Sequence, residues 1–185
     1  MRVTPTSLPE VLMLDLERHD DARGSFMELW REDKLAAAGI PARIVQANLT
    51  TSRKGVLRGL HFQEPNAQDK LITVLSGAIF DVAVDIRRGS PHFGRWVGVE
   101  LSAANRRQLW IPRGFAHGLC VLTDEAQVQY GCTDYYAPAH DRTIRWDDPA
   151  LGIDWPVRMP TLSAKDESAP LLANAPVLPS YRTEP

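Results

Sequence analysis

The stretch AIFDVAVDIR, residues 78–87, decides the fold class of this chain. Its apolar residues recur at every second position, as in a β-strand whose two faces meet different surroundings. One face carries Phe80, Val82, Val84 and Ile86, and the other carries Asp81, Ala83 and Asp85. A carboxylate in the middle of a buried strand needs a partner or water. The second face is therefore expected to line a polar cavity.

Similar short segments precede and follow this strand. They are RIVQANLT (43–50), GVLRGLHF (55–62), KLITVL (70–75), RWVGVELS (95–102), RQLWIP (107–112), AHGLCVL (116–122), AQVQYGCT (126–133) and TIRWDD (143–148). Clusters of glycine, proline, asparagine or aspartate separate several of them, at the spacing typical of an antiparallel sandwich or barrel. We therefore predict an all-β protein, an antiparallel jelly-roll barrel whose mouth can hold a ligand.

A single domain covering residues 1–185 is expected, because no internal repeat or low-complexity linker divides the chain. One of a few short helices is predicted over REDKLAAAGIP, residues 31–41, with acids in its first turn, Gly39 as its stop and Pro41 beyond. The segment from about 170 to 185 is rich in proline, alanine and serine, and we expect it to form a surface tail.

Composition excludes several classes of protein. A formal net charge of −2, a pI near 6.2 and scattered basic residues do not favour nucleic acid as a partner. The N-terminus lacks an apolar signal core, and no apolar run approaches about 18 residues, so we expect a cytoplasmic protein without a membrane span. Cys120 and Cys132 could meet across a hairpin, but reduced thiols that pack in the interior fit a cytoplasmic protein better.

The strands around residues 55–71 carry polar groups that an apolar core does not explain. Arg58, His61, Gln63 and Lys70 interrupt a run of apolar residues there. Buried charge is costly unless it is paired or functional, so these groups are expected to line a wet pocket. Arg58 and His61 are three residues apart, and a regular strand would point them to opposite faces. We predict a bulge at Gly59 that brings both to one side.

Several chemistries fit this pattern poorly. Jelly-roll metal sites commonly use a His-x-His pair, but Gln63 stands at the second position, and Arg58 and Lys70 would repel a cation. Neither cysteine lies in a nucleophile motif, no serine lies in a strained elbow, and no glycine-rich phosphate loop is present. Acid–base chemistry at a carbon next to a ketone remains. A histidine can remove the proton, a carboxylate can orient the histidine, cations can stabilise an enolate, and a tyrosine can return a proton to the opposite face.

The candidates for this chemistry are Arg58, His61, Lys70, Asp81, His117, Tyr130 and Asp166. Taken singly, each has a structural alternative. A strand histidine is more often a satisfied structural residue, Tyr130 could fill the core, and Asp81 could pair with Arg58. The density of polar residues near several strand ends favours a catalytic site over separate structural roles.

The blocks VLRGLHFQ, NAQDKL, GAIFDVAVDIRRGSPHFGRWVGVELS, RQLWIPRGFAHG, TDYYAP, IRWDDPALGIDWP and LSAKD resemble the dTDP-4-dehydrorhamnose 3,5-epimerase family, in the right order from about Leu8 to Leu172. The resemblance implies a cupin-type jelly roll without metal or other cofactor, and a homodimer. It also implies conversion of dTDP-4-dehydro-6-deoxy-D-glucose into dTDP-4-dehydro-L-rhamnose, in dTDP-L-rhamnose biosynthesis.

The same resemblance implies roles for individual residues. His61 is the expected base, Asp166 its carboxylate partner and Tyr130 the proton donor. Lys70 and Arg58 are expected to bind substrate and stabilise the enolate. The other expected substrate contacts, mostly to the nucleotide, are His117 (with Asp81 behind it), Arg23, Glu28, Gln46, Ala47, Asn48, Tyr136, Asp141 and Lys165. Asp141 stands where the family often has glutamate, and His19 where it often has phenylalanine.

Three alternatives remain open from the sequence. A relative that inverts only C3 of another dTDP-4-keto-deoxysugar shares most of these motifs. A non-catalytic cupin that binds a nucleotide sugar, or a metal-dependent cupin oxygenase, would have a similar barrel. For the homodimer, we expect the segment from Arg23 to Glu28 to complete the partner's nucleotide site, and an N-terminal strand with exposed Met13, Leu14 and Leu16 to be available for pairing.

Overall fold

The computed structural model describes residues 1–40 and 43–181. The strands are β1 (Arg2–Pro5), β2 (Leu12–Asp15), β3 (Arg18–Asp21), β4 (Gly24–Met27), β5 (Gln46–Arg53), β6 (Leu57–Gln63), β7 (Lys70–Ser76), β8 (Ala78–Asp85), β9 (Trp96–Ser102), β10 (Arg107–Ile111), β11 (Phe115–Val121), β12 (Glu125–Cys132) and β13 (Asp141–Thr143). The helices are short: α1 (Glu32–Ala37), α2 (Ala164–Glu167) and the 3-10 turns η1 (Pro138–His140) and η2 (Leu172–Asn174). None of the described helices is long and apolar enough to cross a membrane.

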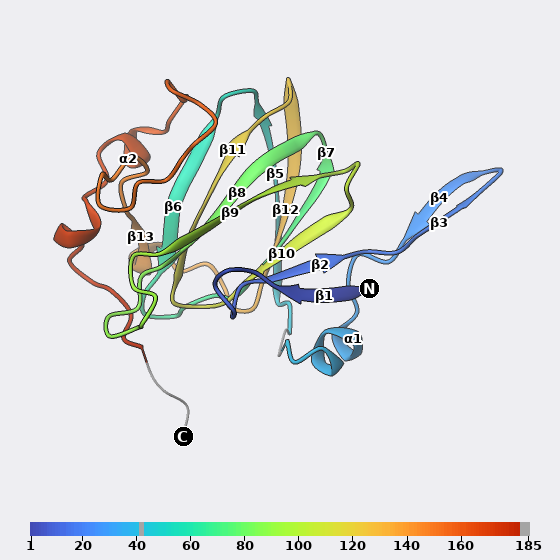
Figure 1. Ribbon diagram of the computed structural model, residues 1–185, viewed down its shortest axis with the longest axis horizontal. Helices are drawn as coiled ribbons and strands as arrows, with labels where there is room; N and C mark the ends of the chain where they lie inside the picture. The colour runs from blue at the N-terminus through green and yellow to red at the C-terminus, as the bar shows by residue number, and fades with distance from the viewer. Residues whose placement is uncertain (41–42, 182–185) are drawn as a thin grey trace.

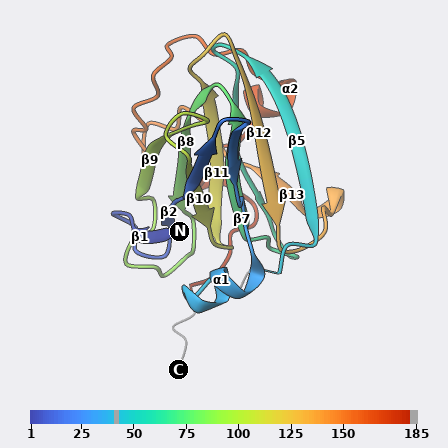
Figure 2. The ribbon, with the colours of Figure 1, turned by 90° about the vertical axis from the view of Figure 1, so that its right-hand side faces the viewer.

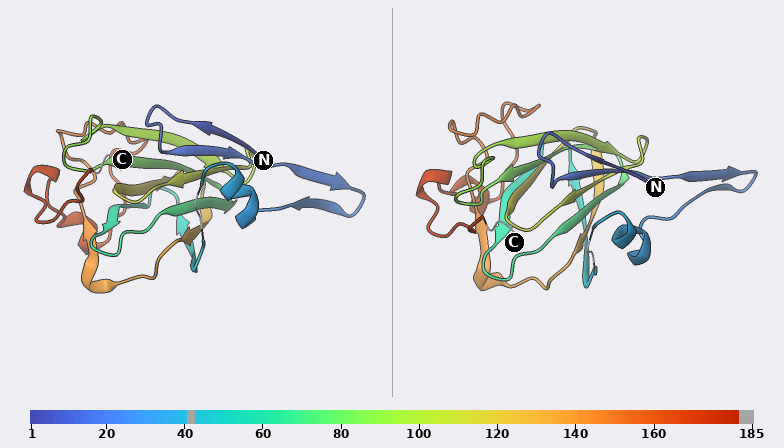
Figure 3. Two further views of the ribbon diagram at one scale, coloured as in Figure 1. Left: turned by 90° about the horizontal axis from the view of Figure 1, so that it is seen from below. Right: turned by 60° about the horizontal axis from the view of Figure 1, so that its bottom comes forward.

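Two antiparallel sheets form the barrel (Figures 1 and 3). One has the strand order β1-β2-β10-β7-β12-β5, and the other has the order β13-β6-β11-β8-β9. The hairpin β3–β4 belongs to neither sheet and projects from the barrel (Figure 1). The predicted all-β jelly roll is therefore confirmed.

The two faces of β8 have the surroundings that its sequence predicts. Ala83, on the inner face, lies in an apolar cluster between the sheets with Ile72, Leu109, Leu119 and other buried side chains. Val82, Val84 and Ile86, on the outer face, lie in a second cluster that residues 144–178 cover. Asp81 shares the inner face with Ala83, which places its carboxylate inside the barrel.

A third cluster lies on the outer face of the six-stranded sheet, where α1 covers Leu14, Leu71 and Trp110. Figure 2 shows α1 at the end of this sheet. The predicted helix is confirmed, and Gly39 follows it with a φ of 78°, a conformation that favours glycine. Pro41, predicted to lie beyond the stop, falls outside the described residues.

The N-terminal prediction was wrong in one respect. Leu14 and Leu16 were expected to be exposed, but their exposed fractions are 0% and 9%, and Met13 is half-buried. The reason is that β2 already has two neighbours, β1 and β10, and α1 covers Leu14. The edge that was expected to be available for pairing is therefore used within the chain.

The strand predicted at 143–148 is shorter and begins earlier, as β13 over Asp141–Thr143. The chain turns at Asp148, whose carboxylate accepts hydrogen bonds from the backbone N–H groups of Ala150 and Leu172. An aspartate that bonds nearby backbone favours a turn over a strand. Cys120 and Cys132 are unpaired and buried, as expected.

The segment after Ala169 packs on the barrel as far as it is described. Leu172 and Ala175 are buried in the second cluster, and the ring of Tyr181 lies 4.9 Å from the guanidinium carbon of Arg87. The ring of Phe115 lies 4.5 Å from the same carbon. Arg87 is thus held between two aromatic rings.

The carboxylate of Asp85 holds the guanidinium of Arg87 in place from inside the barrel. This fully buried carboxylate accepts hydrogen bonds from the Arg87 guanidinium at 2.6 and 2.9 Å and from the Ser90 hydroxyl at 2.6 Å. Burial alone would raise the pKa of Asp85, but the bonds from Arg87 and Ser90 hold this pKa below its usual range. The folded state therefore favours the ionised carboxylate.

Replacing Asp85 should destabilise the fold, because Asp85→Asn leaves the mostly buried Arg87 charge with Glu10 alone. We expect a loss of about 3 kcal/mol, or roughly 6–12 °C in Tm, in thermal denaturation followed by circular dichroism at neutral pH. As a control, Asp147→Asn removes an exposed pair with Arg145 and should change the free energy of unfolding by less than about 1 kcal/mol. Equal effects of the two substitutions would contradict the role given to Asp85.

The pH dependence gives a second check. Because the pKa of Asp85 is lowered on folding, its contribution is complete above the unfolded-state value of about 3.9 and declines as the pH falls through the folded-state value. The difference in Tm between the wild type and Asp85→Asn should therefore be full at about pH 6 and shrink below about pH 4. A difference that does not change with pH would mean that Asp85 is not ionised.

Candidate active site

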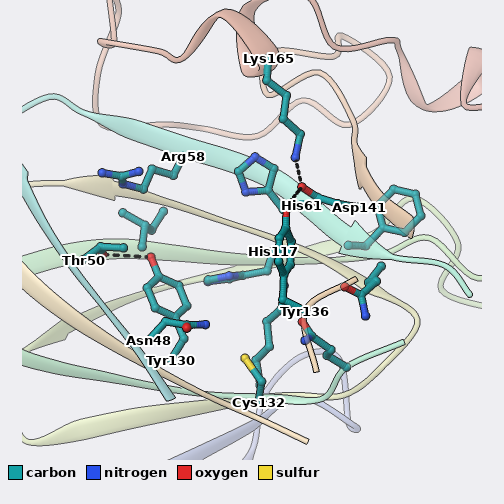
Figure 4. Close-up of a pocket in the computed structure, with 15 residues that line it drawn as sticks. Asn48, Thr50, Arg58, His61, His117, Tyr130, Cys132, Tyr136, Asp141 and Lys165 are labelled. Atoms are coloured by element: carbon teal, nitrogen blue, oxygen red, sulfur yellow. Dashed lines mark hydrogen bonds and ion pairs between the residues drawn. The ribbon is translucent and has the colours of Figure 1, made fainter. Parts of the chain in front are cut away.

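One cavity of about 260 Å³ opens between the sheets and contains most of the polar residues that the sequence singled out (Figure 4). It is lined by Asn48, Thr50, Arg58, His61, Phe62, Gln63, Gln68, Lys70, His117, Leu119, Tyr130, Cys132, Tyr136, Asp141 and Lys165. The six-stranded sheet supplies β5, β7 and β12, and the other sheet supplies β6, β11 and β13. Apolar side chains fill the rest of the barrel interior.

The bulge predicted at Gly59 is present. His117 of β11 pairs with His61 of β6, and Leu119 pairs with Arg58, so the register shifts between these two pairs. Gly59 has a φ of 123°, and a Cβ there would lie 2.6 Å from the Cα of Gly118. Only glycine allows this approach. As a result, Arg58 and His61 both line the cavity.

His61 is held by a buried carboxylate. Its Nε2 lies 2.6 Å from Oδ1 of Asp166, which comes from α2 and is 2% exposed. Burial raises the pKa of Asp166, but hydrogen bonds from His61 and from Ser163 outweigh it and hold this pKa below its ordinary value. An ionised Asp166 accepts a hydrogen bond from the Nε2–H of His61 and leaves Nδ1 of His61 as the basic nitrogen.

A second histidine–carboxylate pair lies deeper in the barrel. Nε2 of His117 lies 3.0 Å from Oδ2 of Asp81, and both side chains are buried. The ring of His117 meets the ring of Tyr130 edge to face, with centroids 5.9 Å apart. Asp81 thus orients His117 from behind, and His117 packs against Tyr130.

Tyr130 comes from the facing sheet, on β12. Burial raises the pKa of its phenol to about 12, although a hydrogen bond from the Thr50 hydroxyl acts in the opposite direction. The Thr50 Oγ1 to Tyr130 Oη distance is 3.4 Å. A phenol with this pKa is protonated at neutral pH and can act as a proton donor.

The cavity contains cations that face few acids. The Nε and Nη2 of Arg58 donate to the Ser52 hydroxyl at 3.1 and 2.9 Å. Neither Arg58 nor Lys70 forms an ion pair with any residue in 1–40 or 43–181. Burial lowers the pKa of the Lys70 ammonium. Two cations arranged in this way favour an anionic ligand.

A third cation lies among exposed residues at the cavity. Lys165 Nζ lies 2.5 Å from Asp141 Oδ2, and the Tyr136 hydroxyl donates to the same oxygen at 3.2 Å. The backbone N–H of Tyr136 donates to the side-chain oxygen of Gln46, and the side-chain Nε2 of Gln46 donates to Oδ1 of Asn48. Figure 4 shows Lys165, Asp141 and Tyr136 on the His61 side of the cavity, with Tyr130 and Thr50 on the other side.

Three predicted site residues neither line the cavity nor form a side-chain hydrogen bond with a residue that lines it. Arg23 is on the projecting hairpin, paired with Asp21, and Glu28 follows the hairpin and pairs with Lys34. Ala47 is exposed on β5 and does not line the cavity. The structure therefore places the catalytic candidates together and leaves Arg23, Glu28 and Ala47 apart from them.

Some lining residues were missed. Thr50 lies two residues after Asn48 on β5, and Cys132 lies two residues after Tyr130 on β12, so each shares the face of a predicted site residue. Period-two alternation from those residues was the available signal. Gln68 lies in the loop before β7, where no such pattern applies.

A jelly-roll barrel whose cavity combines a histidine–aspartate pair, a facing tyrosine and cations without acid partners defines a cupin suited to proton transfer on an anionic substrate. A sequence model described as dTDP-4-dehydrorhamnose 3,5-epimerase matches residues 5–174. The chain belongs to this family.

Individual proteins that are similar to this chain carry the name of a 3,5-epimerase. A Pseudomonas aeruginosa dTDP-4-dehydrorhamnose 3,5-epimerase is 48% identical over 97% of the chain and 100% of its own length. A Neisseria gonorrhoeae protein of the same name is 51% identical over 95% of the chain, which spans 54% of that longer protein. The crystal structure of dTDP-6-deoxy-D-glucose-3,5-epimerase RmlC from Legionella pneumophila, in complex with dTDP-4-keto-L-rhamnose, matches with a TM-score of 0.96 and 47% identity, covering 98% of this chain and 99% of that one.

Because Arg58 and Lys70 face the cavity without acid partners, inorganic pyrophosphate should bind there. We expect it to raise Tm in a concentration-dependent way, by the equivalent of about 2.7 kcal/mol at 100 times its Kd. Arg58→Met and Lys70→Met should each weaken this effect, and Lys54→Met, an exposed substitution outside the cavity, should not. Thermal-shift measurements in which all three variants respond like the wild type would contradict an anion site at these cations.

Proposed function

We propose that this chain inverts C3 and C5 of dTDP-4-dehydro-6-deoxy-D-glucose, giving dTDP-4-dehydro-L-rhamnose, with His61 as the base and Tyr130 as the acid. The observation that carries the proposal is the His61–Asp166 pair, which shares one cavity with Tyr130 from the facing sheet. Membership of the 3,5-epimerase family supports the substrate and the two positions of inversion. In this proposal residues 1–185 form one catalytic domain.

The first step is removal of a proton from carbon. Nδ1 of His61 takes the proton from the carbon next to the C4 ketone, and the electron pair of the broken C–H bond moves to the ketone oxygen. Asp166 stabilises the imidazolium that forms. The enolate oxygen carries negative charge, which Arg58 and Lys70 stabilise from the cavity wall.

The second step is return of a proton to the opposite face of the same carbon. The Tyr130 phenol donates its proton as the enolate collapses to the ketone, which inverts the centre. His61 then loses a proton to solvent, and the Tyr130 phenolate regains one. The same pair of steps at the second carbon completes the reaction, because both carbons flank the C4 ketone.

The nucleotide part is assigned to the polar residues around Tyr136. Lys165 suits a phosphate, and it would exchange Asp141 for the diphosphate when substrate binds. The exposed ring of Tyr136 suits stacking on thymine, and Gln46 and Asn48 lie beside it. His117, oriented by Asp81, contacts the sugar.

Substitutions of His61 and of Tyr130, which lie on opposite sides of the cavity, should have different effects on the reaction. In deuterated buffer, His61→Ala should abolish both solvent exchange and inversion at C3 and C5, because no enolate forms. Tyr130→Phe should keep exchange, since His61 can return a proton to the face it came from, and should lose inversion by about 10²–10⁴-fold. NMR of the sugar product measures both quantities.

The product spectrum also separates this proposal from its alternatives. An L-configured ring requires inversion at C5, so a product inverted only at C3 would contradict the proposed 3,5-epimerisation. Exchange at C5 at the native rate in His61→Ala would mean that another residue is the base. Both variants should keep the wild-type fold, because Tyr130→Phe retains the packed ring and His61 faces the cavity.

The active form is a homodimer in which Arg23 and Glu28 of one chain complete the nucleotide site of the other. The projecting hairpin β3–β4 supports this, because it carries Arg23 away from its own cavity and Phe26 on it is 69% exposed. An arm of this kind is suited to reach a second, symmetry-related copy.

Mixing inactive variants tests this exchange. Arg23→Ala and His61→Ala homodimers should each be weakly active or inactive, but a 1:1 co-expressed mixture should recover about a quarter of wild-type activity, since half of the dimers would hold one intact site. No recovery would mean that Arg23 acts within its own chain. Light scattering that shows a stable, fully active monomer would contradict the dimer itself.

A further inference from the structure

We infer that Thr50 is a positioning residue for Tyr130: its hydroxyl fixes the phenol oxygen at the place from which the proton is delivered, and it stabilises that oxygen once the proton has left. The inference rests on the proposed role of Tyr130 as the acid. The aliphatic hydroxyl of Thr50 is a much weaker acid than a phenol, so it acts through Tyr130 and does not itself protonate the sugar.

The strand register brings the two hydroxyls together. Thr50 lies on β5, the edge strand of the six-stranded sheet (Figure 2), and pairs with Val128 of β12. Tyr130 pairs with Asn48, so Thr50 and Tyr130 are diagonal neighbours on the inner face. A tyrosine is long enough to cover this diagonal, and the Thr50 Oγ1 to Tyr130 Oη distance is 3.4 Å.

The direction of the hydrogen bond suits a proton donor. A hydroxyl can accept and donate at the same time, so the Tyr130 oxygen can accept from Thr50 while the phenol's own O–H points into the cavity. Among residues 1–40 and 43–181, Thr50 is the sole hydrogen-bond partner of the Tyr130 hydroxyl. The contact therefore orients the phenol without competing for the proton that it gives away.

The ring is fixed by a different contact. His117 meets it edge to face at 5.9 Å, and Asp81 holds His117 at 3.0 Å. His117 therefore restrains the ring, and Thr50 restrains the hydroxyl. Figure 4 shows Thr50 beside the Tyr130 oxygen, on the side away from Lys165 and Asp141.

The contact gains strength during the reaction. Burial makes the phenolate costly, and the Thr50 hydrogen bond is a local contact that opposes this cost. A hydrogen bond to a charged acceptor is roughly twice as strong as one between neutral groups. Ser52, two residues further along β5, accepts hydrogen bonds from the guanidinium of Arg58, and the charge of Arg58 also favours the phenolate. The inner face of β5 thus positions both the acid and a cation.

One phenol has to serve two carbons on either side of C4, which makes its position important. A displacement of about 1 Å at a reacting group can cost about 10²-fold in rate. Without Thr50, the hydroxyl end of Tyr130 is restrained only through its ring. Proton return should then slow, whereas proton removal by His61 should not.

The test compares Thr50→Val, Thr50→Ser and Thr51→Val in deuterated buffer. Thr50→Val has nearly the same shape but no hydroxyl, and we expect about tenfold lower inversion, with KM and deuterium exchange within about twofold of wild type. Thr50→Ser should restore inversion. Thr51→Val is the matched control, because Thr51 is the next residue of β5, is exposed and does not line the cavity.

The ratio of exchange to inversion separates positioning from mere packing. A purely structural role for Thr50 would lower exchange and inversion together, and that result would overturn the inference, as would a wild-type ratio in Thr50→Val. Tyr130→Phe serves as the reference. A raised ratio in Tyr130→Phe with a wild-type ratio in Thr50→Val would refute the role of Thr50 alone, and a wild-type ratio in Tyr130→Phe would refute the acid itself.

Discussion

The site depends on the close approach of β6 and β11 at Gly59. A side chain there would collide with the backbone of Gly118 and with the His117 carbonyl, so the two strands can shift register only because residue 59 is glycine. The shift turns Arg58 and His61 to the same face, while Leu57 and Leu60 remain in the outer apolar cluster. A regular strand would bury one of the two polar side chains in that cluster, at a cost of several kcal/mol.

The inside of the barrel is divided by polarity. Apolar side chains of β7, β8, β10 and β11 fill one part, and the other part contains two histidine–carboxylate pairs, a phenol and several cations. The carboxylates of Asp81, Asp85 and Asp166 are almost fully buried, and each has a histidine or arginine partner that offsets its desolvation. The cations Arg58 and Lys70 face the cavity instead. This division leaves net positive charge where an enolate oxygen and a diphosphate would lie.

The edge strand β5 joins several features of the site. Its inward residues contact Tyr130 and Arg58, Gln46 and Asn48 near its start support Tyr136, and its outward Leu49 is exposed. The strand has a neighbour on one side only, within the described chain.

The strand pattern, the bulge and the family could be predicted from the sequence because each depends on residues that are close together in the chain. The alternation of residues 80–86 determined the strand and its two faces, and glycine at position 59 together with the spacing of Arg58 and His61 determined the bulge. The motifs around His61, Tyr130 and Asp166 determined the family and the expected chemistry. Each of these signals lies within a few residues, where backbone geometry and side-chain period decide the outcome.

Only the tertiary structure decided which distant residues meet. Thr50 and Tyr130 are 80 positions apart, so their contact depends on strand order and register. His61 and Asp166 are 105 positions apart, and their pairing was expected only through the family resemblance. The same applies to Leu14 and Leu16, which look like an exposed edge in sequence but are buried in the structure, where β2 lies between β1 and β10 and α1 covers Leu14. Arg23 and Glu28 likewise lie far from the cavity because the hairpin leaves the barrel. A sequence determines the local preference of each segment. The packing of the segments decides which distant side chains contact one another and which line the same cavity.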